Sequence, residues 1–296
     1  MIKMFMVWIV LGVFCFSCVL FAQDEGAGND TTNSDDGKIE EVIDWAWKGK
    51  YYPYIEVTAG LAQLKHEKFE GELPEEGLAE IKLGYSQIQQ YEDIVWELDQ
   101  RFVFGSYMDD NTASFVSPEA GDFKAKITRF GFGNRVGYGY KLGPIELLPF
   151  FQSGLMWTKI KTDTLNDLSQ HDKDILARYE NVLRFGMQAE GGIQFQLLNS
   201  IGIIASYELS VIYPRHIFWE WLGSYIIIQA GEGMVSTFAD DIIKSSPLFG
   251  PVFYFLLKNG LAYAYYQGVK EKMNWPFDSE TPMTMENIKV GISLTF

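Results

Sequence analysis

Residues 183–197, LRFGMQAEGGIQFQL, alternate between two kinds of side chain, and this alternation decides the fold. The odd-numbered positions are mostly apolar, and the even-numbered positions are Gly, Gln, Arg and Glu. A period of two is typical of a β-strand, whose successive side chains point to opposite faces. The stretch is also longer than the roughly five or six residues of an ordinary strand. It therefore predicts a long strand with one apolar face and one polar face.

The same alternation recurs along most of the chain after residue 50. Tyr, Trp and Phe gather near the ends of these stretches, and charges fall on the face that is rich in small residues. A soluble β-sandwich would also alternate and is the structural alternative. Strand length, aromatic ends and charges on the small-residue face favour an all-β fold, a transmembrane antiparallel up-and-down β-barrel over 51–296. The strands predicted with this pattern cover about 51–64, 78–87, 94–105, 123–141, 145–160, 181–197, 201–213 and 286–296.

The predicted connections alternate between long and short. Outer-membrane barrels have short periplasmic turns and long outer loops. Because an exported N-terminus starts in the periplasm, every second connection, beginning with the first, is expected outside the cell. The long connections are 66–77, 106–121, 161–179 and 214–250, and the short ones are 87–93, 142–144 and 199–200.

The number of strands depends on the region between Pro214 and the last strand. Asn259-Gly260 is a strong two-residue hairpin signal. It would join strands at 252–258 and 261–270, which favours ten strands. The alternative is one large loop and eight strands. The insert 214–250 is predicted to be a helical extracellular segment that packs on the barrel rim, covers or plugs the lumen as a lid, or lies in the outer lipid interface.

The N-terminal region has the features of an export signal. A basic start, a long apolar stretch and a small residue before a polar one predict a signal peptide over residues 1–22, cleaved after Ala22. An uncleaved membrane anchor and a lipoprotein site at Cys18 are the alternatives. Residues 23–50 are predicted to be an acidic flexible segment, with a short helix over 39–48.

Composition excludes several function classes. The 296 residues include 24 basic and 39 acidic side chains, for a formal net charge of −15. This excess excludes nucleic acid as a partner, because phosphates select Lys and Arg. Cys15 and Cys18 both lie in the predicted signal peptide, so the barrel is expected to lack disulfides and cysteine metal sites.

The sequence offers no recognisable catalytic motif. Its three histidines, His66, His171 and His216, fall in predicted outer loops, and their spacing matches no metal motif. It contains no Gly-x-Ser-x-Gly and no phosphate-binding loop. We therefore predict no catalytic, cofactor-binding or metal site, no cofactor, and no enzymatic activity.

Eight charged residues are predicted to line the lumen, because we place them on the small-residue faces of the strands. They either border a narrow pore or pair into a network that fills the interior. Small barrels have interiors about wide enough for side chains alone, and buried charges need partners. The filled lumen is therefore the expected arrangement. The eight residues are Lys82, Glu97, Asp99, Arg101, Arg135, Arg184, Glu190 and Glu208.

The chain ends in Ile-Ser-Leu-Thr-Phe, with Ile292, Leu294 and Phe296 on one face. With the leader and the strands, this ending resembles small bacterial outer-membrane β-barrels of the OmpX, OmpW and opacity-protein type, or the ten-stranded omptins. The resemblance implies a cell outer membrane of the Gram-negative type as the location. It also implies the lipid bilayer and the outer-membrane assembly machinery as partners, the latter reading the terminal residues as its signal.

Three functions are consistent with this sequence. The leading one is an outer-membrane barrel whose surface-exposed loops serve surface interaction or envelope integrity, without catalysis. The first alternative is a porin-like narrow channel for small or hydrophobic solutes, gated by the 214–250 insert. An outer-membrane enzyme is the second alternative. An extracellular ligand or a small solute would be the partner of the loops or the lumen.

Overall fold

The computed structural model describes residues 50–92, 94–110, 112, 123–163, 168–198 and 200–296. The predicted signal peptide, 1–22, and the short helix at 39–48 lie outside the described residues, as does the acidic segment 23–50 apart from Lys50. These assignments stay predictions.

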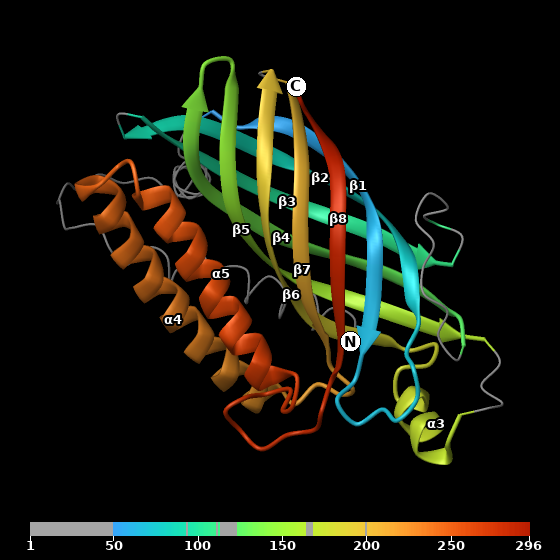
Figure 1. The fold of residues 1–296 in the computed structure, drawn as a ribbon. Helices are drawn as coiled ribbons and strands as arrows, with labels where there is room; N and C mark the ends of the chain where they lie inside the picture. Colours follow the sequence, from blue (N-terminus) through green and yellow to red (C-terminus); the bar gives the residue numbers. More distant parts are fainter. Residues whose placement is uncertain (1–49, 93, 111, 113–122, 164–167, 199) are drawn as a thin grey trace, which may run out of the picture. The chain divides into compact units, whose positions relative to one another are not determined.

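Eight strands form one closed barrel in which each strand pairs antiparallel with its neighbour in the sequence, and β1 pairs with β8 (Figure 1). This order confirms the predicted all-β antiparallel up-and-down barrel. The strands are β1 (Tyr52–Lys65), β2 (Glu75–Glu92), β3 (Val95–Asp109), β4 (Ala125–Leu142), β5 (Ile145–Thr162), β6 (Leu183–Leu198), β7 (Ile201–Ile212) and β8 (Met283–Thr295).

The prediction of ten strands is wrong, and eight is the observed number for the described residues. Residues 252–270 fall almost entirely in α5 (Gly250–Val269), which runs straight through Asn259-Gly260. The physical reason is that 252–258, VFYFLLK, is apolar without the polar alternation of a barrel strand. Pro251 also lies in the first turn of α5, where its fixed φ suits a helix.

The connections define two ends of the barrel. At one end, here called the turn end, β2–β3, β4–β5 and β6–β7 are joined by a few residues each. At the other, here called the loop end, the long connections carry the helices α3 (Gln170–Ala177), α4 (Phe218–Ser245) and α5. Among the described residues, no helix has the length and the apolar character needed to cross a membrane.

Helix α3 covers the loop end of the lumen. Its Ile175 and Leu176 pack into the same apolar cluster as Leu64 and Met108, whose side chains point into the barrel. Asp172 of α3 accepts hydrogen bonds from the backbone N–H groups of Glu70 and Gly71, at 3.0 and 3.1 Å. The β1–β2 loop and α3 therefore hold each other in place over the opening.

Helices α4 and α5 form an antiparallel hairpin beside the barrel (Figure 1). α5 packs on β4, β5, β6 and β7. The hairpin leaves β7 and returns to β8 at the loop end, yet Leu248 at its tip accepts a hydrogen bond from Tyr140 near the β4–β5 turn, at 2.5 Å. The helical insert therefore lies along the outer wall toward the turn end. A rim, lid or plug position, as predicted for 214–250, is not what the structure shows.

Gly260→Ala tests the helix at the predicted hairpin turn. Gly260 is exposed, has no positive φ, and an added Cβ would meet nothing within 4 Å. In a helix, Ala in place of Gly stabilises by roughly 0.5–1 kcal/mol, whereas a type I′ turn would be destabilised. We expect a small gain in urea resistance, measured by circular dichroism at the helical band.

Gly84→Ala is the matched control for that measurement. A Cβ at Gly84 would lie 2.0 Å from the Arg101 carbonyl oxygen, so this variant is expected to lose stability. Loss of stability in Gly260→Ala would contradict the helical assignment.

Candidate functional site: a charged layer inside the barrel

A layer of eight charged side chains crosses the interior at mid-barrel. Four are carboxylates and four are cations, so their formal charges sum to zero. All eight side chains have no solvent exposure. The layer consists of Glu56, Glu80, Glu190 and Glu208 with Lys82, Arg129, Arg135 and Lys289.

Lys289 is the centre of this layer. Its Nζ lies 2.9 Å from a carboxylate oxygen of Glu80, 2.7 Å from one of Glu190 and 2.6 Å from one of Glu208. Oxygens of these three carboxylates come within 4.8 Å of one another, a grouping that can hold a metal ion. Here the ammonium group contacts all three, so the chain supplies the cation itself.

The two arginines tie the layer together from the other side. Arg135 binds Glu56 through two hydrogen bonds of 2.7 and 3.0 Å, and also donates to Gln100 and Gln152. A bidentate pair of this kind is among the stronger charge-assisted contacts. Arg129 donates to Glu80 at 2.8 Å and also pairs with Glu208.

The strand register explains why these residues meet. Gln100, Arg135, Gln152, Glu190 and Glu208 are direct partners across β3, β4, β5, β6 and β7, and so form one rung around the wall. The rung places the like charges of Glu190 and Glu208 side by side, which would be unfavourable without a shared cation. Lys289 provides that cation from β8.

Apolar side chains close the interior on both sides of the charged layer. Toward the turn end, Leu98, Leu148, Phe150 and Ile204 form one buried cluster. Toward the loop end, the lumen is filled by a second cluster under α3, which includes Leu64, Leu78, Met108, Ile127, Ile160, Met283 and Met285. The charged network is therefore sealed between two apolar layers.

Five of the eight residues predicted to line the lumen lie on its face. Lys82, Arg135, Glu190 and Glu208 belong to the charged layer. Arg184 is on the same face of β6 but near the loop end, where its guanidinium donates to the carbonyl oxygen of Arg178 just after α3. Arg184 thus binds the C-terminal end of α3, the helix that covers the loop end of the lumen, and takes no part in the central network.

The lumen prediction is wrong for Glu97, Asp99 and Arg101, which point outward from β3. Their neighbours Gln100 and Phe102 are the ones buried inside, and the side chain of Arg101 is 42% exposed. The prediction places Leu98, Phe102 and Phe104 on the outward face of β3, whereas these side chains are buried inside the barrel.

Inside the barrel, the aromatic rings of β3 have a specific use. Phe102 and Phe104 each turn a ring face toward a cation of the central layer. The Lys82 ammonium is 5.1 Å from the Phe102 ring centroid, and the Arg129 guanidinium is 5.4 Å from that of Phe104. Cation–π contacts of this kind are favourable in a desolvated site, so aromatic rings fit an interior position on β3.

The prediction omitted half of the central layer, namely Glu56, Glu80, Arg129 and Lys289. A signal for them is present in the sequence. Glu80 is two residues from Lys82 on β2, and Arg129 is six residues from Arg135 on β4. Even separations place each pair on one face of a strand, so extending the interior face along β2 and β4 would have found Glu80 and Arg129.

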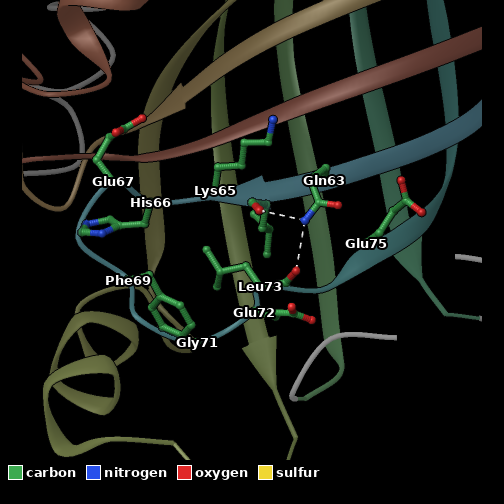
Figure 2. Close-up of a pocket in the computed structure, with 10 residues that line it drawn as sticks. Gln63, Lys65, His66, Glu67, Phe69, Gly71, Glu72, Leu73 and Glu75 are labelled. Carbon is green, nitrogen blue, oxygen red and sulfur yellow. Dashed lines mark hydrogen bonds between the residues drawn. The ribbon is translucent and has the colours of Figure 1, made fainter. Parts of the chain in front are cut away.

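A shallow cavity lies at the loop end beside the β1–β2 loop (Figure 2). The side-chain amide of Gln63 donates to the carbonyl oxygens of Leu64 and Leu73, at 3.1 and 3.0 Å. This amide therefore ties the β1–β2 loop to the end of β1. Burial lowers the pKa of His66 on the rim of the cavity.

The other two histidines also have structural surroundings. A ring nitrogen of His171 lies 3.0 Å from the carbonyl oxygen of Lys68. His216 packs against the rings of Phe185 and Trp221, and burial lowers its pKa.

Comparisons with known proteins give no family by sequence. No family model matches the chain, and no curated protein matches it.

Solved structures with a similar arrangement include three bacterial proteins. Neisserial surface protein A has 9% identity and a TM-score of 0.41, with 84% of this chain and all of that chain covered. Ail, the attachment invasion locus protein of Yersinia pestis, has 10% identity and a TM-score of 0.29, covering 83% and 99%. The outer membrane protein OprG from Pseudomonas aeruginosa has 10% identity and a TM-score of 0.25, covering 83% and 96%.

Lys289→Met tests the central role of this side chain. Removing the ammonium leaves three buried carboxylates without their shared cation, and breaking a buried ion pair in this way costs about 3–5 kcal/mol. We expect a large drop in the urea concentration at the unfolding midpoint. The folded fraction at each urea concentration is measured by heat-dependent gel mobility.

Lys65→Met is the matched control, because Lys65 pairs with Glu286 at 2.7 Å but its side chain is half-exposed. Exposed pairs contribute about 0–1 kcal/mol. Equal effects of the two substitutions would show that the interior network does not depend on Lys289.

Proposed function

We propose that this protein is an outer-membrane β-barrel with a sealed interior, which serves surface interaction or envelope integrity and has no catalytic role. The observation that carries the proposal is an inverted distribution of side chains. Charges lie buried at the centre of the barrel, and apolar side chains lie exposed on its wall. A protein surrounded by water shows the opposite preference.

The exposed wall supports a lipid environment. Four adjacent strands of the wall present contiguous outward-facing apolar side chains. In spatial order they are β8, β1, β2 and β3. Large apolar patches of this kind mark interaction or membrane surfaces, and an apolar outward band is a property of transmembrane barrels. The band includes Val57, Ile81, Leu83, Val103, Ile288, Val290, Ile292 and Leu294.

The interior supports a barrel that does not conduct. Eight paired charges and two apolar layers occupy the lumen, and α3 covers its loop end. A gate formed by the 214–250 insert is not supported, because the α4–α5 hairpin packs on the outside of β4–β7. Work at the cell surface through the long loops is therefore the function that this geometry favours.

Planar-bilayer recording tests the sealed interior. We expect full-length protein that shows heat-dependent gel mobility to give no discrete conductance, because the lumen is filled. A large general porin in the same bilayer confirms that channels are detected. Stepwise conductance from the folded protein would overturn the sealed barrel and favour the solute channel.

Val290→Arg tests the lipid-facing wall. Val290 is 57% exposed and lies in the middle of β8. Arg on the lipid face costs about 2–4 kcal/mol at the bilayer midplane and about 0–1 kcal/mol near the interfaces. We expect a loss in this range from urea unfolding in lipid vesicles.

Leu198→Arg is the matched control at the turn end, since Leu198 is also exposed but ends β6. Its expected loss is small. Equal, small losses at both positions would mean that the wall faces water.

A further inference from the structure

The α4–α5 hairpin has an apolar face that no described part of the chain covers. Met234 is 70% exposed and Leu256 is 58% exposed, although both lie within long helices. The exposed apolar side chains of the two helices are Phe218, Trp219, Ile226, Ile227, Met234, Phe238, Val252, Phe253, Leu256 and Tyr263. A surface helix in water would place polar residues on such a face.

The opposite face of the hairpin is fixed to the barrel at both ends. Toward the loop end, Trp221 and Tyr266 pack in one cluster with Val211 of β7. Toward the turn end, Ile243 and Tyr254 pack with Tyr138 of β4. The rings of Tyr138 and Tyr254 meet edge to face, with centroids 4.8 Å apart. The hairpin therefore follows the wall along most of its height.

The middle of α5 packs closely against a glycine on the outer wall, Gly191 of β6. A Cβ at Gly191, which faces outward from β6, would lie 2.1 Å from Oδ1 of Asn259. The lack of a side chain at this position lets the two elements approach closely. The amide nitrogen of Asn259 donates to the carbonyl oxygen of Phe255 at 2.8 Å, so it is bound within the helix.

The charges in the middle of the hairpin are turned away from the exposed face. Lys258 of α5 is buried, and its Nζ donates to the backbone carbonyl oxygen of Glu232 in α4 at 3.1 Å and lies 4.0 Å from the Glu232 carboxylate. The same ammonium group lies 5.7 Å from the ring centroid of Phe151 on the wall.

The remaining charges of the two helices lie near the ends of α4. Glu220 is in its first turn, and Asp240, Asp241 and Lys244 are in its last two turns. Between them, Glu232 and Lys258 are the charged residues of the hairpin, and they contact each other. This distribution leaves the exposed middle apolar, as the core of a bilayer requires.

We propose that the exposed face of the α4–α5 hairpin lies in the acyl chains of the outer membrane, so that the hairpin and the bare wall form one lipid-facing surface. This proposal rests on the proposed function. Neither helix has the apolar character to cross a membrane by itself, but the barrel wall covers one side of the hairpin, so only the exposed face would meet lipid. At 1.5 Å per residue, the helices are about 42 and 30 Å long, against an apolar band about 25 Å tall on such barrels. Lipid is favoured over a second copy of the chain because this face continues the apolar character of the barrel wall.

Single-cysteine quenching tests the proposal in the full chain. With Cys15→Ser and Cys18→Ser as background, Met234→Cys and Leu256→Cys probe the exposed face. Val290→Cys reports the bare wall, and Asp278→Cys, whose side chain is 95% exposed in the loop after α5, reports water. Each variant is labelled with an environment-sensitive fluorophore and refolded into phosphatidylcholine vesicles. Doxyl-labelled lipid and aqueous iodide serve as the two quenchers.

We expect doxyl lipid to quench the Met234→Cys and Leu256→Cys probes as strongly as the Val290→Cys probe, and iodide to quench only the Asp278→Cys probe. Iodide quenching of both hairpin probes, with lipid quenching at Val290→Cys, would overturn the proposal and leave the membrane barrel standing. Iodide quenching at Val290→Cys would overturn the proposed function itself.

Binding of a second copy of the chain to the exposed hairpin face would give a third quenching pattern. Hairpin probes quenched by neither reagent, and released to lipid quenching when the protein is diluted into more vesicles, would show self-association and overturn the proposal. Two positions on different helices guard against a variant that fails to fold, and heat-dependent gel mobility of each variant confirms barrel closure.

Discussion

One ammonium group satisfies three carboxylates at the centre of this barrel, and the rest of the interior is built around it. Lys289 contacts Glu80, Glu190 and Glu208 within 2.9 Å. Placing charges out of contact with water is costly unless they are paired, and here four acids balance four bases. The requirement for pairing fixes the register, because a shift of one residue would turn these side chains to the opposite face.

Much of this fold could be predicted from the sequence, since alternation is a local property. The strict pattern of 183–197 fixes the faces of β6, and Glu190 lies inside as expected. The alternation in β4 likewise places Arg135 inside. β3 is different because large apolar residues occur on both of its faces, while its charged residues all lie on the outward one. Which face points inward is decided by its partners, such as the pairing of Gln100 with Arg135, and a single strand carries no record of its partners.

The helical hairpin shows a second limit of local patterns. Asn259-Gly260 favours a tight turn, but the cost of Gly within a helix is only about 1 kcal/mol. Packing of α5 on the barrel outweighs that preference. The contact of Asn259 with Gly191 joins residues far apart in the sequence, so the position of the hairpin on the wall could not be derived from periodicity.

The hairpin joins the barrel in a way that keeps the last two strands together. Ile212 at the end of β7 and Met283 at the start of β8 are direct partners, so the chain leaves the wall and returns to it at one point. The strands that α5 contacts, β4 to β7, all precede it in the chain. Its seat is therefore made entirely of strands that precede it in the chain, and a hairpin docked there holds the start of β8 beside the end of β7.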